Sequence, residues 1–590
     1  MKMKKFMAVL LTCCMIAPMA ACGGSTPATQ GGNNPASDAG QEAGTSSGET
    51  GDAGEAGSGE AVETKDTATG SASSSELVDG KFAETRHITV EVYDRGNDGG
   101  SDPTDNMYTK YIKEGMLADH NVEVEFKAVP RWTEVDELNN LLAAGDAPDI
   151  CVTYDYPTIQ TYANMGGVQD LQPYVDGCKD DLPNLWNWLE ATNIYWDKNI
   201  SDGTIWAIEG KRATTNRIVT FVRQDWLDKL GIAEPTTTQE FADMLVAFRD
   251  NADTLLGSDA SKIVPYSVSY DVGWRTATLI ESFIDPQISD YDFYVNGFDD
   301  RKLTEPGTKD AIKLVNKWYN DNLMWKDFAL YESDSTVEDD MMKAGYVGAF
   351  THNWDYPFRN GDDSINANLS RLIGPEAKFV AIDPFQDKNG GHNKFVTSTA
   401  GDRKIFFPNS NDEPLASMLY LDWISDPEHI QYLQLGDEGV THNKLDDGSY
   451  EVIAAEGEAI MNSGMNIDYT ITCNGLHLMD DETTLKSTAH NYPGIEPADV
   501  EKADKIANTD IRREKNINVG QVTSEDGMGT ALSEKRDAVY DQSVIVAPEK
   551  FDETWDYYME DYLTSGGQAI IDERAQLWSD TYGSATNLEQ

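Results

Sequence analysis

Cysteine is scarce in this sequence, and its spacing excludes the chemistry that clustered cysteines support. The chain has 6 cysteines in 590 residues. Three of them fall within the first 22 residues, and the other three are Cys151, Cys178 and Cys473. Because these three have neither a CxxC pair nor metal-ligand spacing, the sequence predicts no metal site and no disulfide framework. Cys151 is expected to be a small buried hydrophobe, and a single disulfide between Cys178 and Cys473 stays open.

Basic residues are also few. The sequence has 46 Lys and Arg against 102 Asp and Glu, which gives a formal net charge of −56. So acidic a surface argues against nucleic acid or anionic lipid as a direct partner. It suits a secreted protein that meets a neutral or cationic ligand, but acidity that only maintains solubility explains the charge equally well. Charge alone therefore identifies no ligand.

The sequence has no apolar run of transmembrane length, but its N-terminus is that of an exported protein. Residues 1–5 are basic, and the apolar run over residues 6–18 is too short to span a bilayer. Small residues then precede Cys22, an arrangement that resembles the bacterial lipobox and implies cleavage after residue 21 and a lipid on the Cys22 sulfur. The alternative is an ordinary secretory signal cleaved after Ala21.

Residues 22–80 contain no aromatic side chain and consist mostly of Gly, Ser, Thr, Ala, Asn and Glu. Such a segment cannot bury enough apolar surface to fold, so we expect a disordered tether between the membrane and the folded part. The rest of the chain is rich enough for a large core, since 39% of all residues are hydrophobic and 13 are Trp. Its length predicts more than one lobe.

The folded part begins with alternating strand and helix patterns. Residues 87–93 and 122–126 alternate like strands, and residues 106–119 and 138–144 have helical spacing. Gly145 is placed to end the second helix, and residues 150–154 form an apolar run that suits a strand buried on both faces. This order predicts an α/β fold with parallel strands, in which ligands bind beyond the carboxyl ends of the strands.

Several motifs then occur in a fixed order, and together they carry a resemblance. They are LAAGDAPDI at 142–150, GGVQDLQPY at 166–174, RQDWLDKLGI at 223–232 followed by Pro235, and GDEGVTH at 436–442. In this they resemble the extracellular solute-binding lipoproteins of ABC importers, of the carbohydrate-binding type. The resemblance implies a two-lobed periplasmic-binding-protein-like fold with a ligand cleft between the lobes and several hinge crossings. It implies residues 85–215 plus 350–412 for the N-terminal lobe, and 216–349 plus 413–590 for the C-terminal lobe, the latter with a helical extension.

Sugar binding needs flat aromatic faces beside planar hydrogen-bonding groups. Pairs of this kind follow several predicted strands, and Glu438 lies in a turn expected near the cleft. Each aromatic residue alone is more often a core residue, but the position after a strand favours Trp274 and Trp354 as ligand contacts. The candidate ligand-binding residues are Arg131, Trp132, Asp155, Tyr156, Trp206, Trp274, Trp354, Asp355 and Glu438.

Motifs for catalysis are missing. The folded part contains no serine nucleophile elbow, HExxH or P-loop motif. With 102 Asp and Glu, carboxylate pairs at glycosidase separation are inevitable, so they do not indicate an enzyme. Residues 196–199 lack the spacing of a calcium loop. We therefore predict a monomeric receptor without catalytic residues, cofactor or metal, lipid-anchored on the outer face of the cell membrane, that delivers an oligosaccharide to an ABC permease. The alternatives are a surface glycosidase or polysaccharide lyase, and a peptide-binding receptor of the same fold.

Overall fold

The computed structural model describes residues 76–588 except 97–100, 195–202, 214–216, 332–335, 397–401, 493, 514, 516, 518, 520, 521, 526 and 527. The predicted leader, the Cys22 anchor, most of the predicted tether and residues 196–199 lie outside the described residues. No described helix combines the length and apolarity that a membrane crossing requires.

Two large clusters of buried hydrophobic side chains divide the described chain into two lobes. The first lobe comprises residues 76–213 and 402–478, and the second comprises residues 217–396 and 494–588. Helix α17 (Asp481–His490) lies between them in sequence and contacts β15 of the first lobe and α18 of the second. The chain thus passes three times from one lobe to the other.

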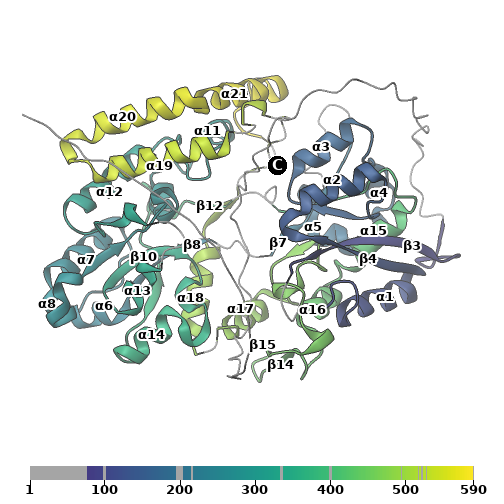
Figure 1. Cartoon of the computed structure of the whole chain (residues 1–590), viewed down its shortest axis with the longest axis horizontal. Helices are drawn as coiled ribbons and strands as arrows, with labels where there is room; N and C mark the ends of the chain where they lie inside the picture. The colour runs from purple at the N-terminus through teal and green to yellow at the C-terminus, as the bar shows by residue number, and fades with distance from the viewer. Residues whose placement is uncertain are drawn as a thin grey trace, which may run out of the picture. The chain divides into compact units, whose positions relative to one another are not determined.

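The first lobe is built on a mixed sheet (Figure 1). Strands β3 (Arg86–Asp94) and β4 (Val122–Pro130) pair in parallel along their whole length. A parallel bridge between Val90 and Ile150 joins β3 to the segment that leads into β5 (Cys151–Thr153). Strand β13 (Lys404–Phe406) runs antiparallel to both β5 and β6 (Ile208–Glu209). The carboxyl ends of β3, β4 and β5 therefore lie at the same edge.

The helices predicted over residues 106–119 and 138–144 are present, and the predicted helix end at Gly145 is confirmed. Asn106 caps α1, with its side chain accepting the backbone N–H groups of Tyr108 and Thr109, and Gly145 ends α2 with a φ of 69°. The helices are α1 (Met107–His120), α2 (Glu134–Ala144), α3 (Tyr156–Asn164), α4 (Gln172–Gly177), α5 (Pro183–Ile194), α15 (Pro414–Trp423) and α16 (Pro427–Leu435). The short strands are β1 (Leu77–Val78), β2 (Lys81–Phe82), β7 (Lys211–Arg212), β14 (His442–Lys444), β15 (Tyr450–Val452) and β16 (Cys473–Asn474).

The second lobe has a four-stranded sheet in the order β11 (Phe379–Ile382), β8 (Ile218–Arg223), β10 (Val347–Asn353) and β9 (Val264–Ser267). Strand β10 is antiparallel to β8 and parallel to β9, and β11 is antiparallel to β8. Beside this sheet, β12 (Lys394–Val396) pairs with β17 (Ile511–Arg513). The helices are α6 (Gln224–Leu230), α7 (Thr238–Asp250), α8 (Ala252–Leu256), α9 (Val272–Arg275), α10 (Ala277–Phe283), α11 (Asp290–Asn296), α12 (Thr308–Asn320), α13 (Val337–Lys343), α14 (Ile365–Leu372), α18 (Pro497–Asn508), α19 (Gly529–Ile545), α20 (Phe551–Tyr562) and α21 (Gln568–Tyr582).

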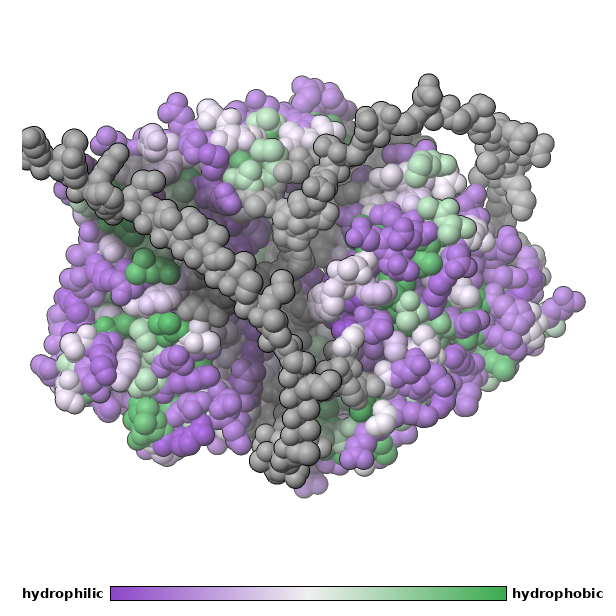
Figure 2. All heavy atoms as spheres, in the orientation of Figure 1, coloured by the Kyte–Doolittle hydropathy of each residue, from purple (hydrophilic) through white to green (hydrophobic). Residues whose placement is uncertain are grey.

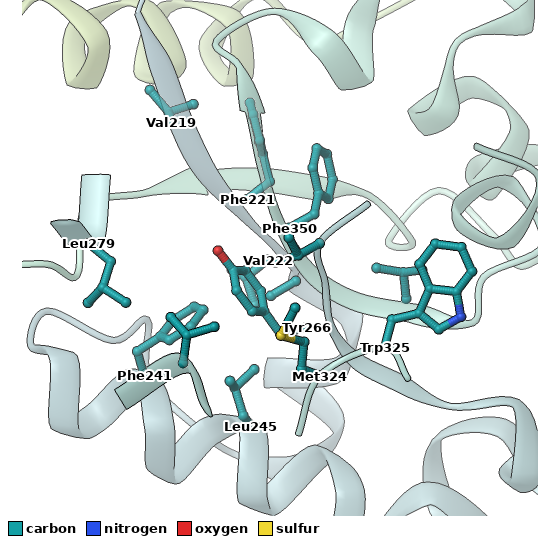
Figure 3. Close-up of a cluster of buried hydrophobic side chains, with 14 of the residues drawn as sticks. Val219, Phe221, Val222, Phe241, Leu245, Tyr266, Leu279, Met324, Trp325 and Phe350 are labelled. Carbon is teal, nitrogen blue, oxygen red and sulfur yellow. The ribbon is translucent and has the colours of Figure 1, made fainter. Parts of the chain in front are cut away.

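Aromatic side chains fill the core of the second lobe (Figure 3). The Phe241 ring meets the Tyr266 ring edge-on at 5.4 Å between centroids, and Phe221 stacks on Phe350 at 5.1 Å. The C-terminal helices belong to this lobe, since α19 packs against α12, α20 and α9 (Figure 1). The predicted helical extension thus reaches α9, the helix that carries Trp274.

The lobe boundaries differ from the prediction. Residues 350–396 were expected in the first lobe, but β10 and β11 pair with β8 of the second. Residues 413–478 were expected in the second lobe, but α15 packs against α1, α5 and β3 of the first. The burial of every β11 residue, and of every β10 residue except Asn353, shows why sequence alone misplaced them. The composition of a strand can indicate that it is buried, but it does not indicate the sheet in which the strand lies.

The surface is mainly hydrophilic on the face shown in Figure 2, as the acidic composition requires. Apolar side chains appear there only in small separate patches. Cys151, Cys178 and Cys473 are buried and form no disulfide, so the pairing of Cys178 with Cys473 that the sequence left open is not made.

Candidate functional site

Polar and aromatic side chains gather where β3, β4 and β5 of the first lobe end. Arg95 directly follows β3, Arg131 and Trp132 follow β4, and Tyr154 follows β5. Because the three strands run parallel, these side chains share one edge of the sheet, which we call the first-lobe edge. Carboxyl edges of this kind are where open α/β sheets bind ligands.

Arg131 is the centre of the first-lobe edge. Its guanidinium carbon lies 4.6 Å from the centroid of the Tyr154 ring, 5.2 Å from that of Tyr93 and 5.4 Å from that of Trp132. The Tyr93 and Tyr154 rings are themselves stacked, with centroids 6.4 Å apart. Trp132 is 65% exposed. A large aromatic face thus stands free beside a planar cation, which is the combination that sugar recognition uses.

The other predicted first-lobe residues have local partners. Asp155 caps α3 by accepting the backbone N–H and the hydroxyl of Thr158, at 2.9 and 2.6 Å. Tyr156 and Trp206 are partly buried against a small separate core cluster that includes Ile159 and Phe406. The structure therefore brings Arg131 and Trp132 together at the edge and gives Asp155, Tyr156 and Trp206 packing or capping contacts.

Sequence reasoning missed two other arginines of this lobe, Arg95 and Arg403. Arg95 binds Asp468 through two hydrogen bonds of 2.8 and 3.0 Å. Arg403 is fully buried, and its Nη1 donates to the carbonyl of Ile467. Burial alone would lower the pKa of Arg403, but the nearby acidic groups of Tyr154, Asp402 and Asp468 outweigh it and raise the pKa above its usual value. No motif marks these residues, because the pairs join segments far apart in the sequence.

The second lobe has an aromatic cluster at the matching edge of its sheet. Strands β9 and β10 run parallel, and Tyr270 and Trp274 follow the first while His352 and Tyr356 lie at the end of the second. The Trp274 ring meets His352 edge-on at 4.8 Å and stacks with Tyr270 at 6.2 Å, and His352 stacks on Tyr356 at 3.4 Å. Trp274 and Tyr270 are partly exposed, so this second-lobe edge offers ring faces to a ligand.

His352 contributes a neutral ring to this cluster. Burial, followed by the charges of Arg275 and Arg359, lowers the pKa of His352 well below its usual value. The imidazole is therefore uncharged at neutral pH. Its Nδ1 accepts the backbone N–H of Asn353 at 2.8 Å. A neutral ring held in this way suits stacking more than proton transfer.

Trp354 and Asp355, both predicted as ligand contacts, lie in the interior. Trp354 is 7% exposed and meets the Tyr492 ring edge-on at 6.0 Å. Asp355 is 2% exposed, accepts the Tyr492 hydroxyl at 2.9 Å and pairs with Arg359 at 2.6 Å. Both residues follow a strand as predicted, but the segment that carries Tyr492 covers them.

Two sets of hydrogen bonds and ion pairs, made by Arg275 and Asp271, hold Trp274 in place at the second-lobe edge. Arg275, next to Trp274, makes two hydrogen bonds to Glu338 at 2.7 and 2.8 Å and a third to the Thr351 carbonyl. Asp271 caps α9 by accepting the Trp274 N–H, and its other carboxylate oxygen accepts the Arg301 Nε at 2.8 Å. The Tyr540 hydroxyl of α19 donates to the Arg301 carbonyl. Trp274 is thereby tied to both the sheet and the C-terminal helices.

Glu438 lies exposed in a turn next to β14, with a backbone bridge to His442. Among the described residues, no side-chain hydrogen bond or ion pair ties Glu438 to either edge. The described residues contain no group of three or more His, Cys, Asp or Glu side chains arranged to hold a metal ion.

Two α/β lobes, joined by several crossings and each with aromatic and polar groups at a carboxyl edge, define the two-lobed fold of a solute-binding protein. The family of bacterial extracellular solute-binding proteins matches residues 108–441. The chain belongs to this family.

Three similar proteins illustrate the relationship. The "Polygalacturonan/rhamnogalacturonan-binding protein YtcQ" of Bacillus subtilis (strain 168) is 22% identical over 342 residues, covering 56% of this chain and 63% of that protein. "Lipoprotein LipO" of the same organism is 25% identical over 347 residues, covering 58% of this chain and 65% of that protein. The solved structure of an "HMO binding ABC-transporter associated Solute Binding Protein" from Bifidobacterium longum infantis has a TM-score of 0.54 at 14% identity, covering 85% of this chain and all of that one. The chain spans just under two thirds of the two curated relatives.

Proposed function

We propose that this protein is the extracellular receptor of an ABC importer and binds an oligosaccharide between its two lobes. The observation that carries this proposal is the presence, in a solute-binding fold, of partly exposed aromatic rings beside planar polar groups at both sheet edges. Trp132 and Trp274 are the ring faces on which sugar would stack, and Arg131 is the planar donor beside them. The names of two similar proteins, one polygalacturonan-binding and one HMO-binding, support a carbohydrate ligand.

The same proposal includes the partners and the location. A lipid on Cys22 would hold the protein on the outer face of the cell membrane, and the tether would let the folded lobes reach the permease. The relative named as a lipoprotein and the one named as ABC-transporter associated support these two points. In this role the protein acts as a monomer, carries out no bond chemistry, and releases the sugar intact.

Thermal unfolding against a panel of oligosaccharides and peptides tests the function. A ligand that binds only the folded state raises the unfolding temperature by mass action. We expect stabilisation by an oligosaccharide that mass spectrometry then recovers uncleaved. Cleaved glycan would establish an enzyme instead, and stabilisation by peptides alone would keep the fold while changing the ligand.

Replacing Trp274 by alanine is expected to weaken sugar binding by about 1.5–3 kcal/mol, the free energy of burying a large apolar side chain. The partly exposed ring should contribute little to folding, so the midpoint of urea unfolding should move only slightly. Titration calorimetry with the sugar found above measures the loss. Wild-type affinity in this variant would exclude the second-lobe edge from the binding site.

A further inference from the structure

Arg131 stands apart from the other arginines. Among the arginine side chains that the structure describes, it alone has no carboxylate, amide or carbonyl oxygen of a described residue within hydrogen-bond or ion-pair distance, and its buried Nε has no acceptor among them. Each of the others has at least one such oxygen. They are Arg86, Arg95, Arg212, Arg217, Arg223, Arg249, Arg275, Arg301, Arg359, Arg371, Arg403, Arg512, Arg536 and Arg574.

This is unexpected in so acidic a chain. The chain has 102 Asp and Glu against 46 Lys and Arg, so there are more than two carboxylates for every basic side chain that could pair with one. Glu134 acts electrostatically on Arg131, but its two oxygens accept hydrogen bonds from the Tyr93 hydroxyl, the Thr153 hydroxyl and the Tyr154 backbone N–H. The Glu134 carboxylate therefore accepts its hydrogen bonds from groups other than Arg131.

The surrounding rings hold Arg131 in a defined pose. Tyr154, Tyr93 and Trp132 all lie within 5.4 Å of its guanidinium carbon, so aromatic faces surround the cation without accepting its N–H groups. The donors of a guanidinium lie in its plane and form a fork that matches two oxygens of one anionic group. Because the described residues give this fork no oxygen acceptor, it is left for a ligand.

A second guanidinium, that of Arg403, lies close enough to act on the same two tyrosines. Arg403 interacts electrostatically with both Tyr154 and Tyr93, and its Nε and Nη2 are buried without an acceptor among the described residues. Arg403 is fully covered, so it would act on a ligand through its charge and not by contact. Asp402 and Asp468 oppose the charge of Arg403, so Arg131 is the cation at this place that has no described acceptor and would attract a negatively charged group on the ligand.

We infer that the oligosaccharide is acidic and that Arg131 binds its negatively charged group. This inference rests on the proposed function, which it narrows from any sugar to one with a carboxylate or a sulfate ester. A charged acceptor gives hydrogen bonds roughly twice as strong as a sugar hydroxyl does. Arg131 would then choose among sugars by charge, while Trp132 and Trp274 bind their apolar faces.

Calorimetric titration of the purified protein tests the inference with three probes: trigalacturonate, its fully methyl-esterified form, and a sulfated neutral trisaccharide. The acid and its ester differ mainly in charge, and the third probe separates a carboxylate from a sulfate. Arg131→Gln removes the charge and keeps a planar amide, Arg131→Lys keeps the charge and loses the fork, and Arg249→Gln on α7 is the matched control, since Arg249 already pairs with Asp250.

We expect the wild-type protein to bind a charged probe more tightly than the ester. Arg131→Gln should weaken that binding about 10- to 100-fold, as for other hydrogen bonds to a charged group, and abolish the preference for charge. Arg131→Lys should lie between the two, and Arg249→Gln should match the wild type. The preference should fall as salt is raised.

Equal binding of acid and ester by the wild type, or an equal loss for both in Arg131→Gln, would overturn the acidic ligand and leave the sugar receptor intact. A preference for the sulfated probe that depends on Arg131 would support the inference with sulfate as the charged group. Failure of every saccharide, charged or neutral, to bind would overturn the proposed function and this inference together.

Discussion

Replacing Trp354 by alanine is expected to lower the free energy of unfolding by about 3–5 kcal/mol, as other deletions of buried aromatic rings do. The ring is 7% exposed and belongs to the main core of the second lobe. Its removal leaves a cavity beside Tyr492, whose hydroxyl bonds the buried Asp355. The midpoint of urea unfolding should fall with little change in slope, since the same surface is exposed on unfolding.

Trp274→Ala is the natural companion of this variant. Both tryptophans follow a strand of the same sheet, but Trp274 is partly exposed and Trp354 is not. We expect Trp274→Ala to lose ligand affinity with little loss of stability, and Trp354→Ala to show the opposite. A Trp354→Ala protein with wild-type stability and weakened sugar binding would contradict its assignment to the core.

The difference between these two tryptophans shows where sequence reasoning ends. Periodicity and position after a strand predicted correctly that both lie at a strand end, because those signals are local. Burial at that end depends on what covers it, and Tyr492 lies 137 residues beyond Asp355. No local pattern connects residues at that separation.

The same limit applies to the lobes and to the arginines of the first-lobe edge. The helix end at Gly145 was predicted correctly because the glycine and the helix that it ends are adjacent in sequence. The sheet in which β10 lies depends on pairing with strands far away in the sequence. The Arg95–Asp468 pair likewise joins residues 373 apart. Arg131 was found through the aromatic residue beside it, although its lack of an acceptor appears only in three dimensions.

Replacing Arg275 by methionine is expected to cost about 3–5 kcal/mol of unfolding free energy, because it leaves the Glu338 carboxylate buried without its cation. Arg275 is completely buried, and the Glu338 side chain is 6% exposed. Among the described side chains, Glu338 would keep the Ser267 hydroxyl, at 2.6 Å, as its one hydrogen-bond donor. The Thr351 carbonyl in β10 would also lose the Arg275 Nε.

The double variant Arg275→Met, Glu338→Leu separates the charge from the packing. Well-packed apolar residues can replace a buried ion pair at little cost, so the double variant should regain most of the stability that Arg275→Met loses. Chemical denaturation of the two single variants and the double variant gives the coupling free energy. Additive losses would mean that the pair is not coupled. Strong coupling would show that the ion pair holds α9, which carries Trp274, against α13.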